Sequence, residues 1–587
     1  MRDERERAGA RDCAGRQEKD SALQDRKKIG KKYLICFWVI WAVQMAAAFY
    51  FCTRKQGFHE DEYYTYYATA RTNGFYVEDG EWMERDVYRS EFVVLPDQRF
   101  QYGLVKLVQS WDVHPPVYYW VFHTAASLVP NVFSKWIGLS VNLFFHGINI
   151  ILLTYLSYIV GKRNIRAALW VTLFSGFGTA AMSGVVFIRM YEMLTTFVLL
   201  CAILHVRAQQ DTRERLSLPG FLLPMGLVTY LGFLTQYYYF IFLFYLAAAF
   251  GLWMLWRDRH IRNCLRYGLC QGLALALACL TYPSCLGQMF RGQRGAQATE
   301  NFLDLSNTWE RIGFFADLMN RYAFGHLFYV FAALAVMLAA AWGILIVAAR
   351  KGRGEERQIA AAAGPDPGFW MLAFAVAGYF LTVSKTALLL GETSNRYQLP
   401  IYGIASLLLF VGIDRLWKMT SAEAKRVDKR KDETGRGDAP RAVTKCIAVV
   451  KRVKWIVPAL CLLAVAWGYH TEGVVFLYPE DKEQTEQAVQ WAAEDVPAVY
   501  LYQPGAEWCI WDVANELFAY PGVYFAAADG TDLIRDDRIK GADALVVYVA
   551  EGAEEAMQVE RILAGSPKLS RGRVMFEEKY CKVYYFD

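Results

Sequence analysis

The sequence lacks the motifs by which many soluble enzymes hold a nucleotide or a metal ion. It contains neither a Walker-type glycine loop nor the glycine fingerprint of a dinucleotide-binding fold. Its twelve cysteines form no CxxC pair and no zinc-binding spacing. No cleavable signal peptide is apparent, because the first apolar run follows a charged tail and is long enough to remain as an anchor. The missing nucleotide motifs fit a reaction that takes place outside the cytoplasm without nucleotides.

The cysteines are mostly scattered along apolar runs, where they are expected to be small buried side chains. Cys509 and Cys581 are the exception, because both fall in the C-terminal region. They could form a disulfide if that region lies in an oxidising compartment.

Long hydrophobic runs are what the sequence has in abundance, with 55% of its residues hydrophobic and 16% aromatic. Runs of about 17–25 apolar residues are long enough to cross a bilayer as helices. The chain is therefore predicted to be a polytopic α-helical membrane protein with about eleven transmembrane helices. The expected spans are residues 33–51, 136–160, 167–186, 191–206, 219–235, 238–256, 267–285, 326–349, 369–389, 398–417 and 455–477.

The basic residues give the expected orientation of these spans. Residues 1–32 are predicted to be a disordered cytoplasmic tail, since they are highly charged and end in two pairs of lysines. With the spans above, every later basic cluster falls on the same side as this tail, as the positive-inside rule expects. The longest cluster, residues 418–454, is predicted to be a disordered cytoplasmic linker facing the membrane rather than a nucleic-acid site.

The first loop, residues 53–135, is predicted to lie outside and to hold interfacial helices. Its aromatic-rich stretch 117–133 could be a further span, but the later basic clusters would then fall outside. We therefore expect 117–133 to lie along the membrane interface. The odd number of spans places residues 478–587 on the same outer side. Alternating short elements predict a small α/β domain there, with strands at 498–502, 523–527 and 544–549, helices at 511–520 and 554–563, and a strand or hairpin at 573–586.

Three consecutive acids, Glu60, Asp61 and Glu62, follow the first apolar run. Charged residues beside a membrane are costly unless they face water or a polar cavity, so we expect them to form the floor of a site at the membrane surface. A carboxylate at Asp61 could take a proton from an attacking hydroxyl or amine. Neighbouring acids would raise its pKa and so tune it as a base. Alternatively, the acids could only cap an interfacial helix.

Further polar residues interrupt the apolar runs on the same outer side. Arg189 and Arg396 offer forked donors to a phosphate, although both could instead snorkel toward lipid headgroups. Tyr191 and Tyr397 lie beside them, and His114 precedes two prolines, where it could simply make a turn. A phosphate held by arginine is a good leaving group, and a membrane location suggests that it is attached to a lipid. Together these residues predict group transfer from a lipid-linked phosphate donor.

The same residues carry a resemblance to a known family. Asp61-Glu62-Tyr63-Tyr64 is similar to the first-loop pattern of GT-C integral-membrane glycosyltransferases. Asp112-Val113-His114-Pro115-Pro116 resembles a stretch of protein O-mannosyltransferases and their bacterial relatives, grouped as glycosyltransferase family 39. Arg189-Met190-Tyr191 and Arg396-Tyr397 with Pro400 look like features of the bacterial members, among them enzymes like the lipid A aminoarabinose transferases.

The resemblance covers residues 33–417 and implies a GT-C-like catalytic module. It implies transfer of a sugar, with inversion, from polyprenyl or dolichyl phosphate to an extracytoplasmic lipid, glycan or protein. Asp61 would be the catalytic carboxylate and Glu62 its partner, and no cofactor would be required. A divalent cation held by Asp61 and His114 stays open. The residues expected to contact donor or acceptor are Glu60, His114, Arg189, Tyr191, Arg396 and Tyr397.

Two other functions stay open. A transporter or flippase of lipid-linked sugars would use the same arginines, but it should carry internal repeats and broken helices, and neither is visible in the sequence. A membrane scaffold presenting the C-terminal domain would need no acidic stretch. The expected location is a bacterial plasma membrane, with the N-terminus in the cytoplasm and the C-terminal domain outside.

Overall fold

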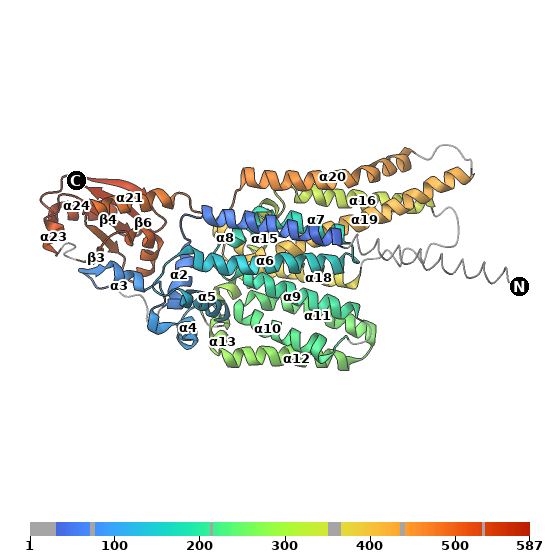
Figure 1. The fold of residues 1–587 in the computed structure, drawn as a ribbon, viewed down its shortest axis with the longest axis horizontal. Helices are drawn as coiled ribbons and strands as arrows, with labels where there is room; N and C mark the ends of the chain where they lie inside the picture. The colour runs from blue at the N-terminus through green and yellow to red at the C-terminus, as the bar shows by residue number, and fades with distance from the viewer. Residues whose placement is uncertain are drawn as a thin grey trace, which may run out of the picture.

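The long apolar runs fold into helices that lie side by side in a bundle, with a small α/β domain at one end (Figure 1). The computed structural model describes residues 31–70, 77–211, 215–290, 292–349, 366–434, 441–530 and 535–587. In this part of the chain, nine helices are long and apolar enough to cross a membrane, and one bent pair makes a tenth. The shorter apolar helix Trp455–Thr471 matches the last predicted span. Each of the eleven runs predicted to span is thus helical, which confirms the polytopic fold.

The bundle begins with the helix Lys31–Arg54, which has no label in Figure 1. The other helices of the bundle carry the labels used below. Their bounds are α6 Lys135–Val160, α7 Ile165–Gly176, α8 Thr179–Val186, α9 Tyr191–Gln210, α10 Leu223–Thr235, α11 Tyr238–Asp258, α12 Ile261–Thr281, α16 Phe328–Ala349, α18 Pro367–Thr386, α19 Leu399–Thr434 and α20 Arg441–Thr471.

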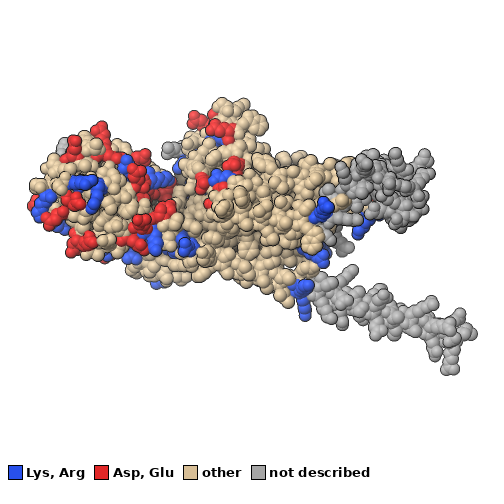
Figure 2. Space-filling model, turned by 90° about the horizontal axis from the view of Figure 1, so that it is seen from above, with Lys and Arg blue, Asp and Glu red and all other residues tan. Residues whose placement is uncertain are grey.

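Contacts between the ends of these helices show that loops predicted to share a side meet at one end of the bundle. Away from the α/β domain, the Arg166 Nε donates to the Tyr33 hydroxyl over 2.6 Å. Beside the domain, the Lys55 Nζ donates to the main-chain oxygen of Phe476 over 2.7 Å. Figure 2 shows lysine and arginine without acidic neighbours at the end of the described surface away from the domain. The helices therefore alternate in direction as the basic clusters predicted.

The basic stretch 418–454 differs from its prediction as a disordered linker. Helix α19 continues to Thr434 and α20 already begins at Arg441, so most of the stretch is helical. Residues 435–440 lie outside the described part, as does the predicted tail up to residue 30. Basic side chains such as lysine and arginine are good helix formers, so two long apolar helices can extend through them into water.

The third predicted span, residues 167–186, is broken into α7 and α8, which meet at 59°. This break was not predicted from the sequence. Gly176, at the end of α7, lies against the first helix, because a Cβ there would sit 2.2 Å from the Gln44 Nε2. That nitrogen donates to the main-chain oxygen of Thr172 over 2.8 Å. A larger residue at position 176 would displace the Gln44 side chain. After the break, α8 ends three residues before Arg189.

The first loop holds short helices, as predicted. Helix α5, Val117–Leu128, has 12 residues and is about 18 Å long, too short for a hydrocarbon core of about 30 Å. It packs against α2, α4, α6 and α10. The prediction that 117–133 does not span is therefore confirmed. The other elements of the loops at the domain end of the bundle are α2 Glu60–Ala70, α3 Arg85–Ser90, η1 Pro96–Gln98, α4 Tyr102–Gln109, α13 Ser284–Phe290, α14 Gln293–Leu303, α15 Thr308–Leu318, η3 Met319–Ala323 and η4 Gly391–Tyr397. The short helix η2 Leu218–Leu222 opens α10 at the opposite end of the bundle.

The C-terminal domain is built on a six-stranded mixed sheet in the order β1-β3-β2-β4-β6-β5. Its elements are α21 Asp481–Ala493, β2 Ala498–Tyr502, η5 Glu507–Val513, α22 Ala514–Leu517, β3 Gly522–Ala527, α23 Asp537–Lys540, β4 Leu545–Ala550, α24 Glu555–Gly565, β5 Gly572–Glu577 and β6 Cys581–Phe586. Strand β2 is parallel to β3 and β4, and β5–β6 form an antiparallel hairpin. The predicted strands and the second helix match closely.

Two features of this domain differ from the sequence-based expectation. Its edge strand β1, Glu81–Glu84, comes from the first loop and pairs antiparallel with β3, with Glu81 opposite Phe525. The domain is therefore not confined to residues 478–587, because a sheet edge can accept a strand from distant sequence. Cys509 and Cys581 are both buried free thiols rather than a disulfide.

Candidate functional site

Helix α2 begins with the three acids of residues 60–62, whose side chains take different partners. Successive helical residues point about 100° apart, so the three cannot share one face. Glu62 is fully buried, and its carboxylate accepts hydrogen bonds from the Lys55 Nζ at 2.9 Å and from the main-chain N–H groups of His59 and Ile188, each at 2.6 Å. Glu62 therefore ties α2 to the end of the first helix and to the α8–α9 connection. It points away from Asp61, whose partner it was expected to be.

We expect Glu62→Gln to destabilise the protein by about 3–5 kcal/mol, because it leaves the buried charge of Lys55 without its counterion. Thermal unfolding of the detergent-solubilised protein measures this change. The double variant Lys55→Met/Glu62→Gln is the matched control and should recover part of the loss, since it removes both charges. An unfolding temperature unchanged in Glu62→Gln would contradict the structural role.

Glu60, expected to contact donor or acceptor, instead meets the C-terminal domain. Its Oε2 lies 2.8 Å from the Lys579 Nζ and accepts a hydrogen bond from the Tyr580 hydroxyl. Both partners belong to the turn between β5 and β6. The side chain at position 60 is thus held by a segment 519 residues away.

Asp61 is the most exposed of the three acids, with 26% of its side chain accessible. Its Oδ2 lies 2.9 Å from the Arg396 Nη1 and 3.6 Å from the His59 Nδ1. The Asp61 main-chain N–H also donates to the His59 Nδ1 over 3.1 Å. Among the described residues, the ion pairs of this carboxylate use Oδ2 alone. Its Oδ1 is left for an incoming group.

The electrostatics of Asp61 reverse the expectation that neighbouring acids raise its pKa. Burial alone would raise the pKa, but Arg396 and Arg189 together hold the pKa of Asp61 well below its usual range. Burial also lowers the pKa of His59 to about 3, against the attraction of Asp61, so this imidazole is neutral. The pKa of Asp61 is lowered rather than raised because Glu60 and Glu62 turn away to lysines while Arg396 faces Asp61.

Arg189 holds the other side of the α2 turn and is only 3% exposed. Its Nη1 donates to the main-chain oxygen of Asp61 at 3.0 Å, to the Thr65 Oγ1 at 3.1 Å and to the Tyr119 hydroxyl at 3.0 Å. Its Nη2 lies 3.3 Å from the His114 Nε2. The structure thus brings three predicted site residues, 61, 114 and 189, into one cluster.

Aromatic side chains frame Arg396, which is also 3% exposed. Its guanidinium lies over the rings of Phe187 and Tyr397, 5.6 and 5.1 Å from their centroids, and Nη2 donates to the Tyr397 hydroxyl over 3.2 Å. Tyr191 stacks on Phe187 at 5.9 Å and meets Tyr397 edge-on at 6.3 Å. Tyr191 and Tyr397 therefore shape the pocket of the arginine.

Both arginines keep one buried donor free. The Nε groups of Arg189 and Arg396 are buried and have no hydrogen-bond partner within the described chain. A buried polar group left unpaired costs about 1–3 kcal/mol, and more if it is charged.

Five side chains of this cluster were missed by sequence reasoning. Their positions in the sequence were an available signal. One of the five side chains lies one helical turn after Asp61, two lie on either side of the His-Pro-Pro motif, and two lie within six residues of the acids. Their roles depend on tertiary contacts that no local pattern announces. The five are Lys55, His59, Thr65, Asp112, whose Oδ2 lies 3.0 Å from the His114 Nδ1, and Tyr119.

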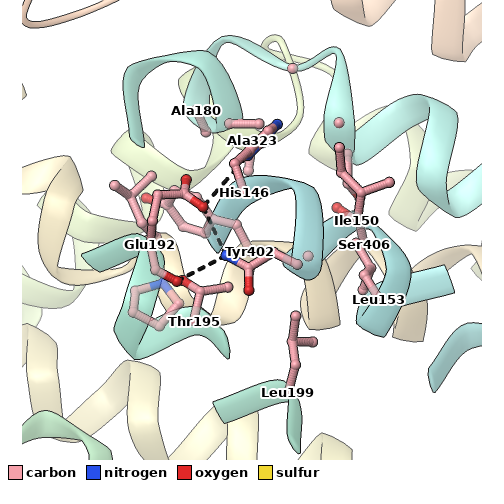
Figure 3. Close-up of a pocket in the computed structure, with 18 of the residues that line it drawn as sticks. His146, Ile150, Leu153, Ala180, Glu192, Thr195, Leu199, Ala323, Tyr402 and Ser406 are labelled. Carbon is pink, nitrogen blue, oxygen red and sulfur yellow. Dashed lines mark hydrogen bonds and ion pairs between the residues drawn. The ribbon is translucent and has the colours of Figure 1, made fainter. Parts of the chain in front are cut away.

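A cavity of about 90 Å³ lies inside the bundle. Figure 3 shows Glu192 and His146 side by side at its polar wall, across from Ile150 and Leu153. The Glu192 Oε2 lies 3.5 Å from the His146 Nδ1 and accepts from the Asn149 Nδ2 over 2.8 Å. The lining runs up to the helix starts that follow Arg189 and Arg396. The cavity is thus lined by the first turns of α9 and α19 but by none of the side chains of the Asp61 cluster.

No metal cluster stands out near this site. Within the described residues, no group of three or more His, Cys, Asp or Glu side chains is placed to hold a metal ion. At Asp61 and His114, where the sequence left a cation site open, Arg189 contacts both residues. Its positive charge would repel a cation at that point.

Neither a protein-family model nor a curated protein sequence matches the chain. Among solved structures, it is similar to ArnT from Cupriavidus metallidurans bound to undecaprenyl phosphate, with a TM-score of 0.49, 12% identity, and coverage of 94% of this chain and 97% of that chain. It is also similar to the archaeal oligosaccharyltransferase AglB from Archaeoglobus fulgidus in complex with an inhibitory peptide and a dolichol-phosphate, with a TM-score of 0.39, 12% identity, and coverage of 78% and 58%. At this level of similarity, function has to be derived from the site itself.

Proposed function

We propose that this protein is a GT-C-type integral-membrane glycosyltransferase that moves a sugar from a polyprenyl-phosphate donor to an acceptor outside the cytoplasm. The observation that carries the proposal is the position of one partly exposed carboxylate, Asp61, between two buried arginines at the domain-proximal end of the helix bundle. A carboxylate can serve as a general base, and arginine is suited to bind phosphate. These are the two parts that transfer from a lipid phosphate requires.

In the proposed reaction, the acceptor oxygen attacks the anomeric carbon of the donor sugar while Asp61 takes the acceptor's proton. The bond between the anomeric carbon and the phosphate oxygen breaks, and its electron pair leaves with the lipid phosphate. This single displacement inverts the anomeric centre. Arg189 and Arg396 would stabilise the leaving phosphate, using the buried donors that now lack partners.

The ion pair between Arg396 and Asp61 would couple the base to the donor. In the pair, the lowered pKa of Asp61 makes its carboxylate a weak base. A donor phosphate that binds Arg396 would bring negative charge close to Asp61 and raise its pKa toward the usual value. The base would therefore become effective once the donor is bound.

The proposed reaction needs no metal ion or cofactor. Two guanidinium groups supply the positive charge that a divalent cation provides in other phosphate-transfer sites. His114, held by Asp112 and facing Arg189, would orient that arginine rather than bind a cation.

We place the basic end of the bundle in the cytoplasm and the α/β domain outside the plasma membrane, following the positive-inside rule. The acceptor would then be an extracytoplasmic lipid, glycan or protein. A reporter enzyme fused at Asp587 and active only outside the cytoplasm tests this orientation.

The transfer reaction itself is tested with purified protein and a panel of polyprenyl-phosphate sugars, with cell-envelope extract as the source of acceptor. Mass spectrometry follows the free polyprenyl phosphate. We expect release from at least one donor by the wild type and none by Asp61→Asn. A folded wild-type protein that releases lipid phosphate from no donor would contradict the proposal.

One observation favours a second candidate function, a transporter or flippase of lipid-linked sugars. The cavity places the ionisable pair Glu192 and His146 among membrane helices and beside the broken helix α7–α8, features that transporters use. Purified protein in liposomes would then flip a labelled lipid-linked sugar without acceptor. Donor turnover without flipping would exclude this alternative.

A further inference from the structure

The turn between β5 and β6 brings the α/β domain to the catalytic turn of α2. Lys579 and Tyr580 of this turn both contact the Oε2 of Glu60, the residue before Asp61. The Lys579 side chain is 52% exposed, and the Asp61 carboxylate beside this contact is 26% exposed. A cation supplied by a separate domain therefore contacts the residue that precedes the proposed base.

We propose that Lys579 binds an anionic group, a phosphate or a carboxylate, on the acceptor, and that Tyr580 supports it there. The α/β domain would thus form the acceptor side of the active site. This inference rests on the proposed glycosyltransferase function and names the chemical class of its acceptor.

The cations that contact Glu60 and Asp61 differ in how deeply they are buried. Arg189 and Arg396 are each 3% exposed and already contact Asp61, so they suit a donor phosphate held deep in the site. Lys579 lies at the surface, where an acceptor arriving from water can reach it. The two kinds of cation therefore serve the two substrates separately.

Glu60, the present partner of Lys579, is easily replaced. An ion pair with one half-exposed member contributes little to stability, because water screens it. Glu60 can therefore give up Lys579 to an acceptor anion at low cost. Glu60 would then act as a built-in competitor for the lysine, which also explains why an acid precedes Asp61.

The turn between β5 and β6 is held firmly in place. The Asp512 carboxylate lies close to the main chain of Lys579 and Tyr580. The Trp508 ring meets Tyr580 edge-on at 4.9 Å, and Trp511 meets Tyr64 of α2 at 4.4 Å. A fixed turn gives Lys579 a defined position beside Glu60 at the start of α2, as a binding group requires.

Opposite effects of two substitutions test this inference. Transfer is measured with purified full-length variants at increasing amounts of cell-envelope extract, and the half-saturating amount of extract is determined for each variant. We expect Lys579→Gln to raise the half-saturating amount of extract about tenfold, through loss of one charged contact. Glu60→Gln should lower it, because Lys579 loses its competitor. Lys582→Gln, on the same hairpin but paired with Glu555, is the matched control and should resemble wild type.

If Lys579 only holds Glu60 in place, both substitutions will raise the half-saturating amount alike, and the inference is overturned. The extract is also split into organic and aqueous phases, and each is passed over an anion exchanger. Acceptor activity that the exchanger retains and that salt elutes supports the inference. The phase in which this activity is found distinguishes a lipid acceptor from a soluble one. Activity in the flow-through overturns it. Failure of wild-type donor release would instead count against the proposed function.

Discussion

Asp61→Asn is expected to lower the rate of sugar transfer by about 10²–10⁴-fold, the usual contribution of a general base. The amide cannot take the acceptor's proton, while its similar size keeps the main-chain contacts of residue 61 with His59 and Arg189. Single-turnover experiments with purified protein measure the loss. Donor binding should be as tight as in wild type or tighter, because Arg396 loses the carboxylate that competes with the donor phosphate.

Asp112→Asn provides the matched control for this prediction. Asp112 is also a partly exposed acid of the cluster, but it contacts His114 rather than the proposed reacting group. We expect a loss of about tenfold or less, as for a weakened support of an orienting residue. If Asp61→Asn keeps more than a tenth of wild-type activity with an unchanged unfolding temperature, Asp61 is not the base.

Arg396→Gln is expected to lower the transfer rate by about 10²–10³-fold, as the loss of one preorganised donor to developing negative charge usually does. It should also change the pH dependence. In the wild type, Arg396 keeps the pKa of Asp61 below its usual range, so the carboxylate stays ionised as the pH falls. Without the guanidinium, that pKa rises, and the acidic limb of the pH–rate profile should move to higher pH. Single-turnover rates between about pH 4 and 8 measure both effects.

Arg396→Lys separates charge from geometry in this prediction. A lysine keeps the positive charge beside Asp61 but lacks the forked donor. We expect it to leave the acidic limb close to that of wild type while still losing much of the rate. An acidic limb unmoved in Arg396→Gln would show that another group controls the ionisation of the base.

The transmembrane organisation was predictable because the signal is local. Each span needs only a run of apolar residues, and the basic clusters between the runs indicate the direction in which each span runs. The strands 498–502 and 523–527 were recognisable for the same reason, since alternating patterns act within a few residues. The break at Gly176 was not, because it depends on the close approach of Gln44 from another helix.

The candidate site was predictable in composition but not in arrangement. Asp61, His114, Arg189 and Arg396 do meet, although they come from four separate segments. The roles assigned to the neighbouring acids do not match the structure. Glu62 is bound to Lys55, and Glu60 reaches the C-terminal domain. Adjacent helical residues diverge in direction, so a run of like charges in sequence need not form a cluster in space.

By itself, the sequence of this protein determined which segments cross the membrane, where the small α/β domain lies and which charged side chains stand at the outer ends of the spans. These depend on hydrophobic length and charge, which are properties of short stretches. The tertiary structure alone decided the partner of each charge and the sign of the pKa shift at Asp61. It also decided two contacts between segments far apart in sequence, the pairing of β1 with β3 and the contact of Lys579 with Glu60. Electrostatic energies depend on distances of a few ångströms between side chains, and only packing sets those distances.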